Sequence, residues 1–139
     1  MVLKWVYRVN LNAKVLAPDK PTSPAWSVGW YFVPIAALWK PYQAIRETWQ
    51  ISTDRKNWRA AAYPLLLRQW WALWIISNIL SNVSFRLSLQ TDVSGMAALG
   101  GVFDLLSDLI DVPCDLVFIA IIRQLTALQV GALSGRSFD

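Results

Sequence analysis

The stretch Trp26–Trp49 reads WSVGWYFVPIAALWKPYQAIRETW and combines four tryptophans with two prolines and a polar end. Tryptophan concentrates where one side of the ring is wet and the other apolar, as at the headgroup level of a bilayer. The apolar part, residues 26–39, would form a helix of about 21 Å. A bilayer core of about 30 Å needs roughly 20 residues. We therefore expect a re-entrant or interfacial segment, broken near Pro34.

The composition of the whole chain also indicates a membrane protein. Its 139 residues are 55% hydrophobic and only 16% charged, against about 25% charged in an average soluble domain. The mean hydropathy is +0.36. All nine tryptophans lie between Trp5 and Trp74. The tryptophans predicted to anchor the chain at the membrane interface are Trp26, Trp30, Trp39, Trp49, Trp70, Trp71 and Trp74.

Two later segments are predicted to cross the bilayer. Residues 64–83 contain 20 residues, which form a helix of about 30 Å, and Arg68 lies one turn in, where it can extend to the headgroups. Residues 95–129 follow one long helical pattern, which we expect to break near Pro113 and to contain the last span. Its start is rich in small residues that suit close helix packing.

The remaining segments are predicted to lie at the membrane surface. Residues 1–25 form an interfacial N-terminal segment and a proline-rich linker. Residues 40–62 form a basic amphipathic segment with a helix from Pro41 to about Ile51. The expected fold is thus a single all-α membrane domain over residues 1–139, with two transmembrane helices, a re-entrant tryptophan-rich segment and an amphipathic surface helix.

The distribution of positive charge predicts the topology. If residues 26–39 do not cross, nearly all lysines and arginines lie on one side, and the loop after residue 83 carries only Arg86. The positive-inside rule then places the basic loops and the C-terminus in the cytoplasm. The expected location is the bacterial inner membrane, as a multi-pass protein.

Four carboxylates are the main candidates for chemistry. Asp104, Asp108, Asp111 and Asp115 are spaced four, three and four apart, so they form one narrow stripe on a helix. The stripe is open to three interpretations. It lines a proton or cation path; or it is a packing seam in which Arg68 meets Asp115, with Asn78 and Asn82 near Asp108 and Asp104; or residues 96–111 lie on the surface with the stripe in water.

Several classes of site are excluded or disfavoured. The chain has no histidine and a single cysteine, Cys114, so His-ligated haem or chlorophyll, a zinc cluster and a His-based catalytic triad are excluded. We expect no catalytic, cofactor or metal residues, and we interpret Glu47 beside Arg46 as a solvated pair. The net charge of +4 comes without a nucleic-acid-binding module, so no nucleic-acid partner is expected.

The run W-x-V-G-W-x-F-V-P-I-A-x-L-W-x-P-x-Q-x-I-x-E-x-W resembles the signature of a bacterial membrane family known as domain of unknown function 4328. The resemblance also takes in Trp5-x-Tyr7-Arg8-x-x-x-Asn12, Trp70-Trp71, and Arg123-x-x-Thr126-x-x-Gln129. It implies an integral inner-membrane protein of several helices and no reaction, cofactor or catalytic residue. Members usually carry further membrane helices before the Trp-x-Tyr-Arg element, so we expect this chain to be a shorter relative or to be missing its first part.

The expected function is non-catalytic. Small size, few chemical groups and small-residue packing faces favour a structural or accessory subunit of a larger bacterial membrane complex. Its expected partners are membrane lipids, other integral membrane proteins or copies of itself, and a bound lipid is compatible with the sequence. The alternative is a small oligomeric transporter, or a proton- or cation-conducting protein, that uses the aspartate stripe.

Overall fold

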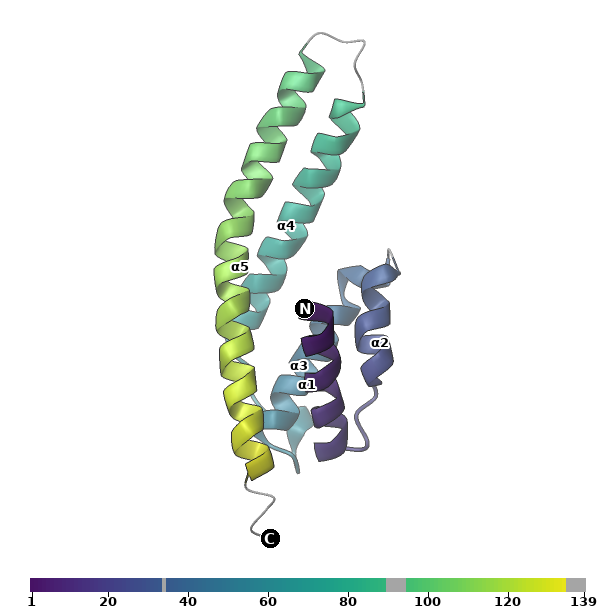
Figure 1. The fold of residues 1–139 in the computed structure, drawn as a ribbon, viewed down its shortest axis with the longest axis vertical. Helices are drawn as coiled ribbons and strands as arrows, with labels where there is room; N and C mark the ends of the chain where they lie inside the picture. Colours follow the sequence, from purple (N-terminus) through teal and green to yellow (C-terminus); the bar gives the residue numbers. More distant parts are fainter. Residues whose placement is uncertain (34, 90–94, 135–139) are drawn as a thin grey trace. The chain divides into compact units, whose positions relative to one another are not determined.

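The computed structural model describes residues 1–33, 35–89 and 95–134, and every regular element within them is helical. This confirms the all-α class. The elements are α1 (Val2–Leu16), α2 (Pro24–Gly29), η1 (Trp30–Phe32), η2 (Ala36–Leu38), α3 (Lys40–Thr53), η3 (Trp58–Ala60), α4 (Leu65–Ser88) and α5 (Met96–Ser134), drawn in Figure 1.

The chain divides into two compact units. Unit 1 comprises Met1–Leu67 and Ile121–Asp139, and unit 2 comprises Arg68–Ala120. Helix α5 therefore contributes its first part to unit 2 and its last turns to unit 1.

None of the helices in the described part of the chain is both long enough and apolar enough to cross a membrane. The two transmembrane helices predicted at residues 64–83 and within 95–129 are thus not supported. Helices do form at both places, as α4 and α5.

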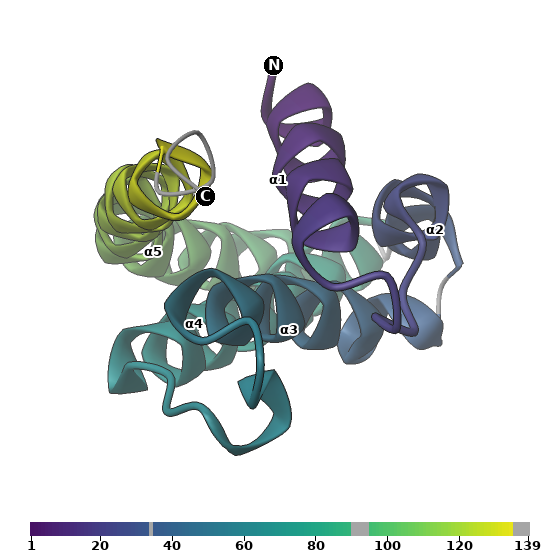
Figure 2. The ribbon, with the colours of Figure 1, turned by 90° about the horizontal axis from the view of Figure 1, so that it is seen from below.

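Helix α3 lies at the centre of unit 1. It begins with Lys40 and Pro41, since proline fits the first turn of a helix. Ile45 and Ile51 are fully buried and Trp49 nearly so. Helix α1 packs against both α2 and α3 (Figure 2). The polar residues Glu47, Gln50 and Ser52 of α3 are buried as well as its apolar ones, and the predicted position of this helix at a membrane surface stays a prediction.

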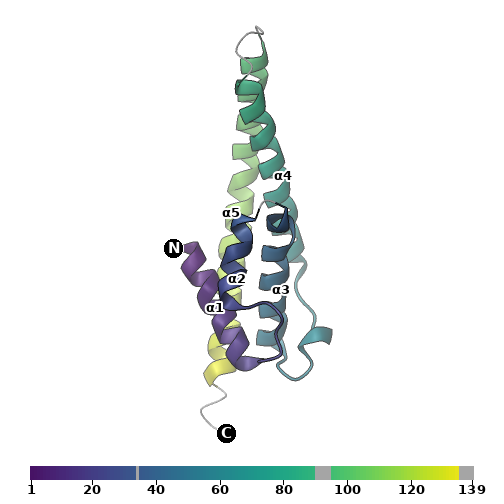
Figure 3. The ribbon, with the colours of Figure 1, turned by 90° about the vertical axis from the view of Figure 1, so that its right-hand side faces the viewer.

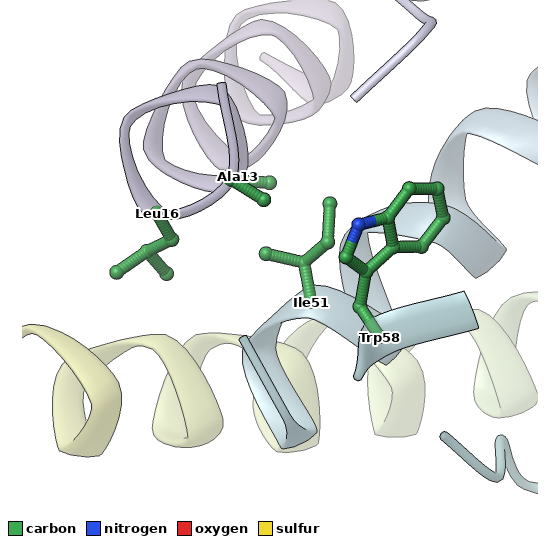
Figure 4. Close-up of a cluster of buried hydrophobic side chains, with 5 residues drawn as sticks. Ala13, Leu16, Ile51 and Trp58 are labelled. Carbon is green, nitrogen blue, oxygen red and sulfur yellow. The ribbon is translucent and has the colours of Figure 1, made fainter. Parts of the chain in front are cut away.

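An apolar cluster joins α1 to the end of α3. Figure 4 shows Ala13 and Leu16 of α1 facing Ile51 of α3 and Trp58 of η3. Ala17 completes the cluster, and Ala132 and Leu133 of α5 pack against it. Unit 1 thus draws its core from segments more than a hundred residues apart in sequence.

The tryptophan-rich segment 26–39 contains no long helix. The Ser23 side chain caps α2 by accepting the Trp26 backbone N–H at 3.3 Å, and Pro24 occupies the first turn. The short helices η1 and η2 follow. The predicted break at Pro34 falls outside the described residues, but the segment is irregular on both sides of that position, as expected.

Unit 2 is an antiparallel hairpin of α4 and the first part of α5, which lie side by side in Figures 1 and 3. Helix α5 continues through Pro113, contrary to the predicted break. Proline leaves the carbonyl four residues earlier, at Leu109, without its helical donor. Leu109 and Pro113 are both exposed, so the helix accommodates the loss at its surface.

Candidate functional site

A buried polar network in unit 1 centres on Lys20. Lys20 Nζ donates to Asn10 Oδ1 at 2.7 Å and lies 3.5 Å from Glu47 Oε2. Asn10 Oδ1 also accepts from Thr48 Oγ1 at 3.1 Å. Lys20, Glu47, Asn10 and Thr48 are all buried. The network ties the loop after α1 to the middle of α3.

The Lys20 ammonium is held as a structural cation. Burial lowers the pKa of Lys20 from 10.5 to about 8, and the Glu47 carboxylate opposes that shift. Besides Asn10 and Glu47, the ammonium donates to the Thr22 carbonyl at 3.4 Å. Its three N–H groups thus face three partners, and its surface is covered. This arrangement suits a clamp between segments and leaves no room for a substrate at the amine.

The sequence interpretation of Glu47 as a solvated partner of Arg46 is wrong, and Lys20 was missed. The sequence of α1 contained one indication of a buried polar network. Val6, Val9, Ala13 and Leu16 repeat at helical spacing, and Asn10 lies within that apolar face. A polar side chain at a core position must find partners inside the protein.

A pocket of about 460 Å³ opens beside Glu47, and we call it the α3 pocket. Four of its residues repeat along one face of α3, and the others come from the segments before and after that helix. The lining residues are Pro21, Gln43, Arg46, Glu47, Gln50, Trp58, Arg59 and Tyr63. The volume lies within the range of small-molecule sites.

A larger hollow of about 930 Å³ lies elsewhere in unit 1, between the end of α3 and the last turns of α5. Its lining includes the apolar residues Trp49 and Leu128. It also includes two cationic residues, Arg55 and Lys56. It shares no lining residue with the α3 pocket.

In unit 2 the hairpin interior contains small polar side chains as well as Trp70, Trp71 and Cys114. Ser107 forms hydrogen bonds with Ser77 at 3.0 Å and Ser81 at 2.6 Å, and Ser84 Oγ donates to the Gly100 carbonyl at 2.8 Å. Ser77 Oγ also donates to Asp111. Large apolar side chains lie on the outside of α5: Leu105, Leu109, Val112 and Leu116 are between 63% and 70% exposed.

The aspartate stripe lies at the edge of the hairpin interface. Asp104, Asp108 and Asp115 are exposed, and Asp111 is half-buried. Asn78 and Asn82 donate to the carbonyls of Trp74 and Asn78 within their own helix. Within the described residues, Arg68 forms no ion pair with Asp115. The pairing that the seam interpretation expected is not among the hydrogen bonds and ion pairs of the described residues, where Asp111 accepts from Ser77 of α4. The other two interpretations of the stripe stay open.

The predicted tryptophan anchors differ in their exposure. Trp49, Trp70 and Trp71 are buried, whereas Trp26 and Trp39 are about half exposed. Trp30 and Trp74 are intermediate. Trp26 stacks on Trp30 at 4.5 Å between ring centroids, and Trp71 stacks on Trp74 at the same distance. Trp70 stacks on Phe118 inside the hairpin. Three of the seven, Trp49, Trp70 and Trp71, thus stabilise the units from within.

Among the described residues, no three His, Cys, Asp or Glu side chains lie close enough together to hold a metal ion. The aspartates are too far apart along the helix to share one ion, since the stripe extends over three turns.

The family profile described as Domain of unknown function (DUF4328) matches residues 1–127. The chain belongs to this family. No curated protein and no solved structure matches it.

In this DUF4328 chain the residues that carry the resemblance at the two ends meet in unit 1. Trp5 Nε1 donates to Thr126 Oγ1 at 3.3 Å, and Asn12 Nδ2 donates to Gln129 Oε1 at 3.1 Å. Gln43 and Glu47 of the central signature both line the α3 pocket. The motifs of residues 5–12, 26–49 and 123–129 thus belong to unit 1, whereas Trp70-Trp71 belongs to unit 2.

Proposed function

We propose that this protein is a non-catalytic accessory subunit whose unit 2 hairpin packs against apolar helices of a larger bacterial membrane complex. The observation that carries the proposal is the inverted character of the hairpin, which buries Ser77, Ser84 and Ser107 and exposes Leu105 and Leu109. Small and polar residues between helices, with apolar residues outside, are the packing pattern of helices in an apolar environment.

The aspartate stripe favours a protein partner over lipid alone. The exposed row of Leu105, Leu109, Val112 and Leu116 has the same four-three-four spacing as the aspartate stripe. Each of its members follows an aspartate by one residue, so the row lies about 100° around the helix from the stripe. Carboxylates beside an apolar surface are costly in hydrocarbon unless they are paired. A partner helix that offers cations or hydroxyl donors opposite Asp104 and Asp108 meets both requirements.

The test compares two matched double variants in the native membrane. Leu109→Gln with Leu116→Gln alters the exposed face of α5, and Phe32→Gln with Ile35→Gln alters equally exposed positions in unit 1. After extraction in mild detergent, we expect the wild type and the unit 1 variant to elute in a stoichiometric complex. The α5 variant should elute alone with unchanged helix content. A wild-type chain that elutes as a monomer contradicts the proposal.

The second candidate is an oligomer that conducts protons or cations along the stripe. Its support is the exposure of Asp104, Asp108 and Asp115 in the single chain, since self-association would enclose them. Asp108→Asn with Asp111→Asn should then abolish ion flux in proteoliposomes while the oligomer stays intact. Unchanged flux in a stable variant removes this candidate.

A further inference from the structure

The larger hollow of unit 1 has a mainly apolar wall. Its volume of about 930 Å³ lies within the range of sites that hold small molecules. Trp49 of α3 and Ala127, Leu128 and Ala132 of α5 supply apolar lining. Ala132 also packs against the buried cluster that joins α1 to the end of α3. The hollow is therefore backed by the core of unit 1.

The hydroxyl groups that line the hollow are already used inside α3. Ser52 Oγ donates to the Thr48 carbonyl at 2.7 Å. Thr53 Oγ1 donates to the Trp49 carbonyl at 3.0 Å. A peptide in the hollow would need partners for its backbone groups, and these two hydroxyls have no donor left to offer it. An acyl chain needs no hydrogen bonds and suits this surface better.

Two consecutive cations, Arg55 and Lys56, also line the hollow. Both are exposed, and within the described part of the chain neither forms an ion pair. The neighbouring Asp54 accepts the backbone N–H groups of Lys56 and Asn57 through Oδ1, at 2.9 and 3.1 Å, and so fixes the turn after α3. Guanidinium and ammonium groups bind phosphate oxygens by charge-assisted hydrogen bonds. The turn therefore favours an anionic head group.

We propose that the larger hollow binds an anionic phospholipid of the bilayer. One acyl chain lies against Trp49 and Leu128, and the phosphate contacts Arg55 and Lys56. The proposal concerns unit 1 and goes beyond the proposed function, because it does not depend on what the hairpin of unit 2 packs against.

The open side of the hollow favours a phospholipid over a free fatty acid. Ala127 and Gly131 line the hollow and are exposed, so a bound chain keeps one side uncovered. A free fatty acid would leave that side in water, which is costly for an apolar chain. A phospholipid keeps its second chain, and the uncovered side of the first, in the bilayer.

The test measures the tryptophan fluorescence of the full chain reconstituted into phosphatidylcholine vesicles. A rising share of the lipid is replaced by phosphatidylglycerol with a dibrominated acyl chain, or by phosphatidylcholine with the same chain. Bromine quenches a tryptophan that it contacts, and Trp49 lines the hollow. We expect the brominated phosphatidylglycerol to add a quenching phase that saturates at a low share, and Trp49→Phe to remove that phase. Equal curves for the two lipids, or no association with the vesicles, would overturn the proposal.

Two matched double variants separate the site from general attraction of charge. Arg55→Gln with Lys56→Gln should raise the half-saturating share about tenfold. Lys4→Gln with Arg8→Gln removes the same charge from exposed positions of α1 and should leave that share nearly unchanged. Equal shifts in the two variants would contradict a site at the larger hollow.

Two glycines of α5 locate the acyl chain. Nothing lies within 4 Å of a Cβ at Gly131 or at Gly101. Gly131 lines the larger hollow, whereas Gly101 belongs to unit 2. Gly131→Leu should therefore take up space in the hollow and weaken the saturable phase, and Gly101→Leu should preserve it. Loss of the phase in both variants, or in neither, would contradict the proposal.

Competition identifies the source of the ligand. Unlabelled phosphatidylglycerol should displace the brominated lipid at a lower share than oleate does. Displacement by oleate at an equal or lower share would assign the hollow to a fatty acid and overturn the proposal. Leu109→Gln with Leu116→Gln, which tests the membrane complex, should keep the saturable phase. Loss of the complex and loss of the lipid site are thereby distinguished.

Discussion

Asn12 and Gln129, 117 positions apart in the sequence, form a hydrogen bond of 3.1 Å between their side-chain amides. Gln129 Nε2 also donates to the Val9 carbonyl at 2.8 Å, and the Gln129 side chain is buried. The side-chain oxygen and the side-chain nitrogen of Gln129 therefore both form hydrogen bonds to α1. They hold the last turns of α5 against that helix. The contact explains why these distant ends belong to one unit.

Replacing Gln129 should loosen that contact. Gln129→Leu keeps the size of the side chain but leaves the Asn12 amide without its acceptor, and we expect the free energy of unfolding to fall by about 1–3 kcal/mol. Gln124→Leu, at an exposed position of the same helix, should change it by less than about 0.5 kcal/mol. Denaturant unfolding in detergent measures both. Similar losses would contradict the role given to Gln129.

The Lys20–Glu47 pair should show strong coupling. Lys20→Met leaves the Glu47 carboxylate buried without its counter-charge, and we expect a loss of about 3–5 kcal/mol in the free energy of unfolding. The double variant Lys20→Met with Glu47→Leu should recover most of the loss. A double-mutant cycle measures the coupling. Additive losses would mean that the two groups act independently.

The pH dependence of stability should report the buried lysine. The Lys20 pKa is about 8 in the folded state, against 10.5 in the unfolded chain. Between these values the unfolded state binds more protons, so the free energy of unfolding should rise with pH. Below about pH 8, Lys20 is charged in both states and its contribution is constant. The measurement is the difference between the wild type and the Lys20→Met/Glu47→Leu variant from pH 7 to 10.5. A flat difference would show that Lys20 titrates normally.

Two adjacent glycines in α5 should respond in opposite directions. A Cβ at Gly100 would lie 3.0 Å from Ser88 Oγ and 3.3 Å from the Ser84 carbonyl, whereas nothing lies within 4 Å of one at Gly101. Gly100→Leu should destabilise the hairpin by about 1–3 kcal/mol through overpacking. Gly101→Leu should stabilise it by about 0.5–1 kcal/mol, because leucine favours the helix. Thermal unfolding in detergent measures the pair, and equal shifts would contradict the close approach at Gly100.

Local patterns predicted several elements correctly. Pro41 marked the start of α3, and residues 64–83 and 95–129 marked α4 and α5 to within a few positions at most ends. In residues 26–39 the predicted break near Pro34 lies outside the described residues, and the described positions on either side form short helices. These features depend on backbone geometry and on spacing along the chain, which neighbouring residues largely set.

The burial of polar groups could not be predicted in the same way. Glu47 has the local pattern of a solvated residue, and it is buried because Lys20, from a loop 27 positions earlier, supplies the opposite charge. The spacing of the aspartate stripe left three interpretations open, and within the described residues the hydrogen bond from the stripe to α4 is the one at Asp111.

Helical class, helix positions and the family were therefore contained in the order of the residues, because propensity, proline placement and apolar spacing act over short distances. The clamp at Lys20, the contact of Asn12 with Gln129 and the α3 pocket came from folding alone. Each depends on which distant segments meet, and the cost of burying a charge or an amide depends on the partner that it meets there.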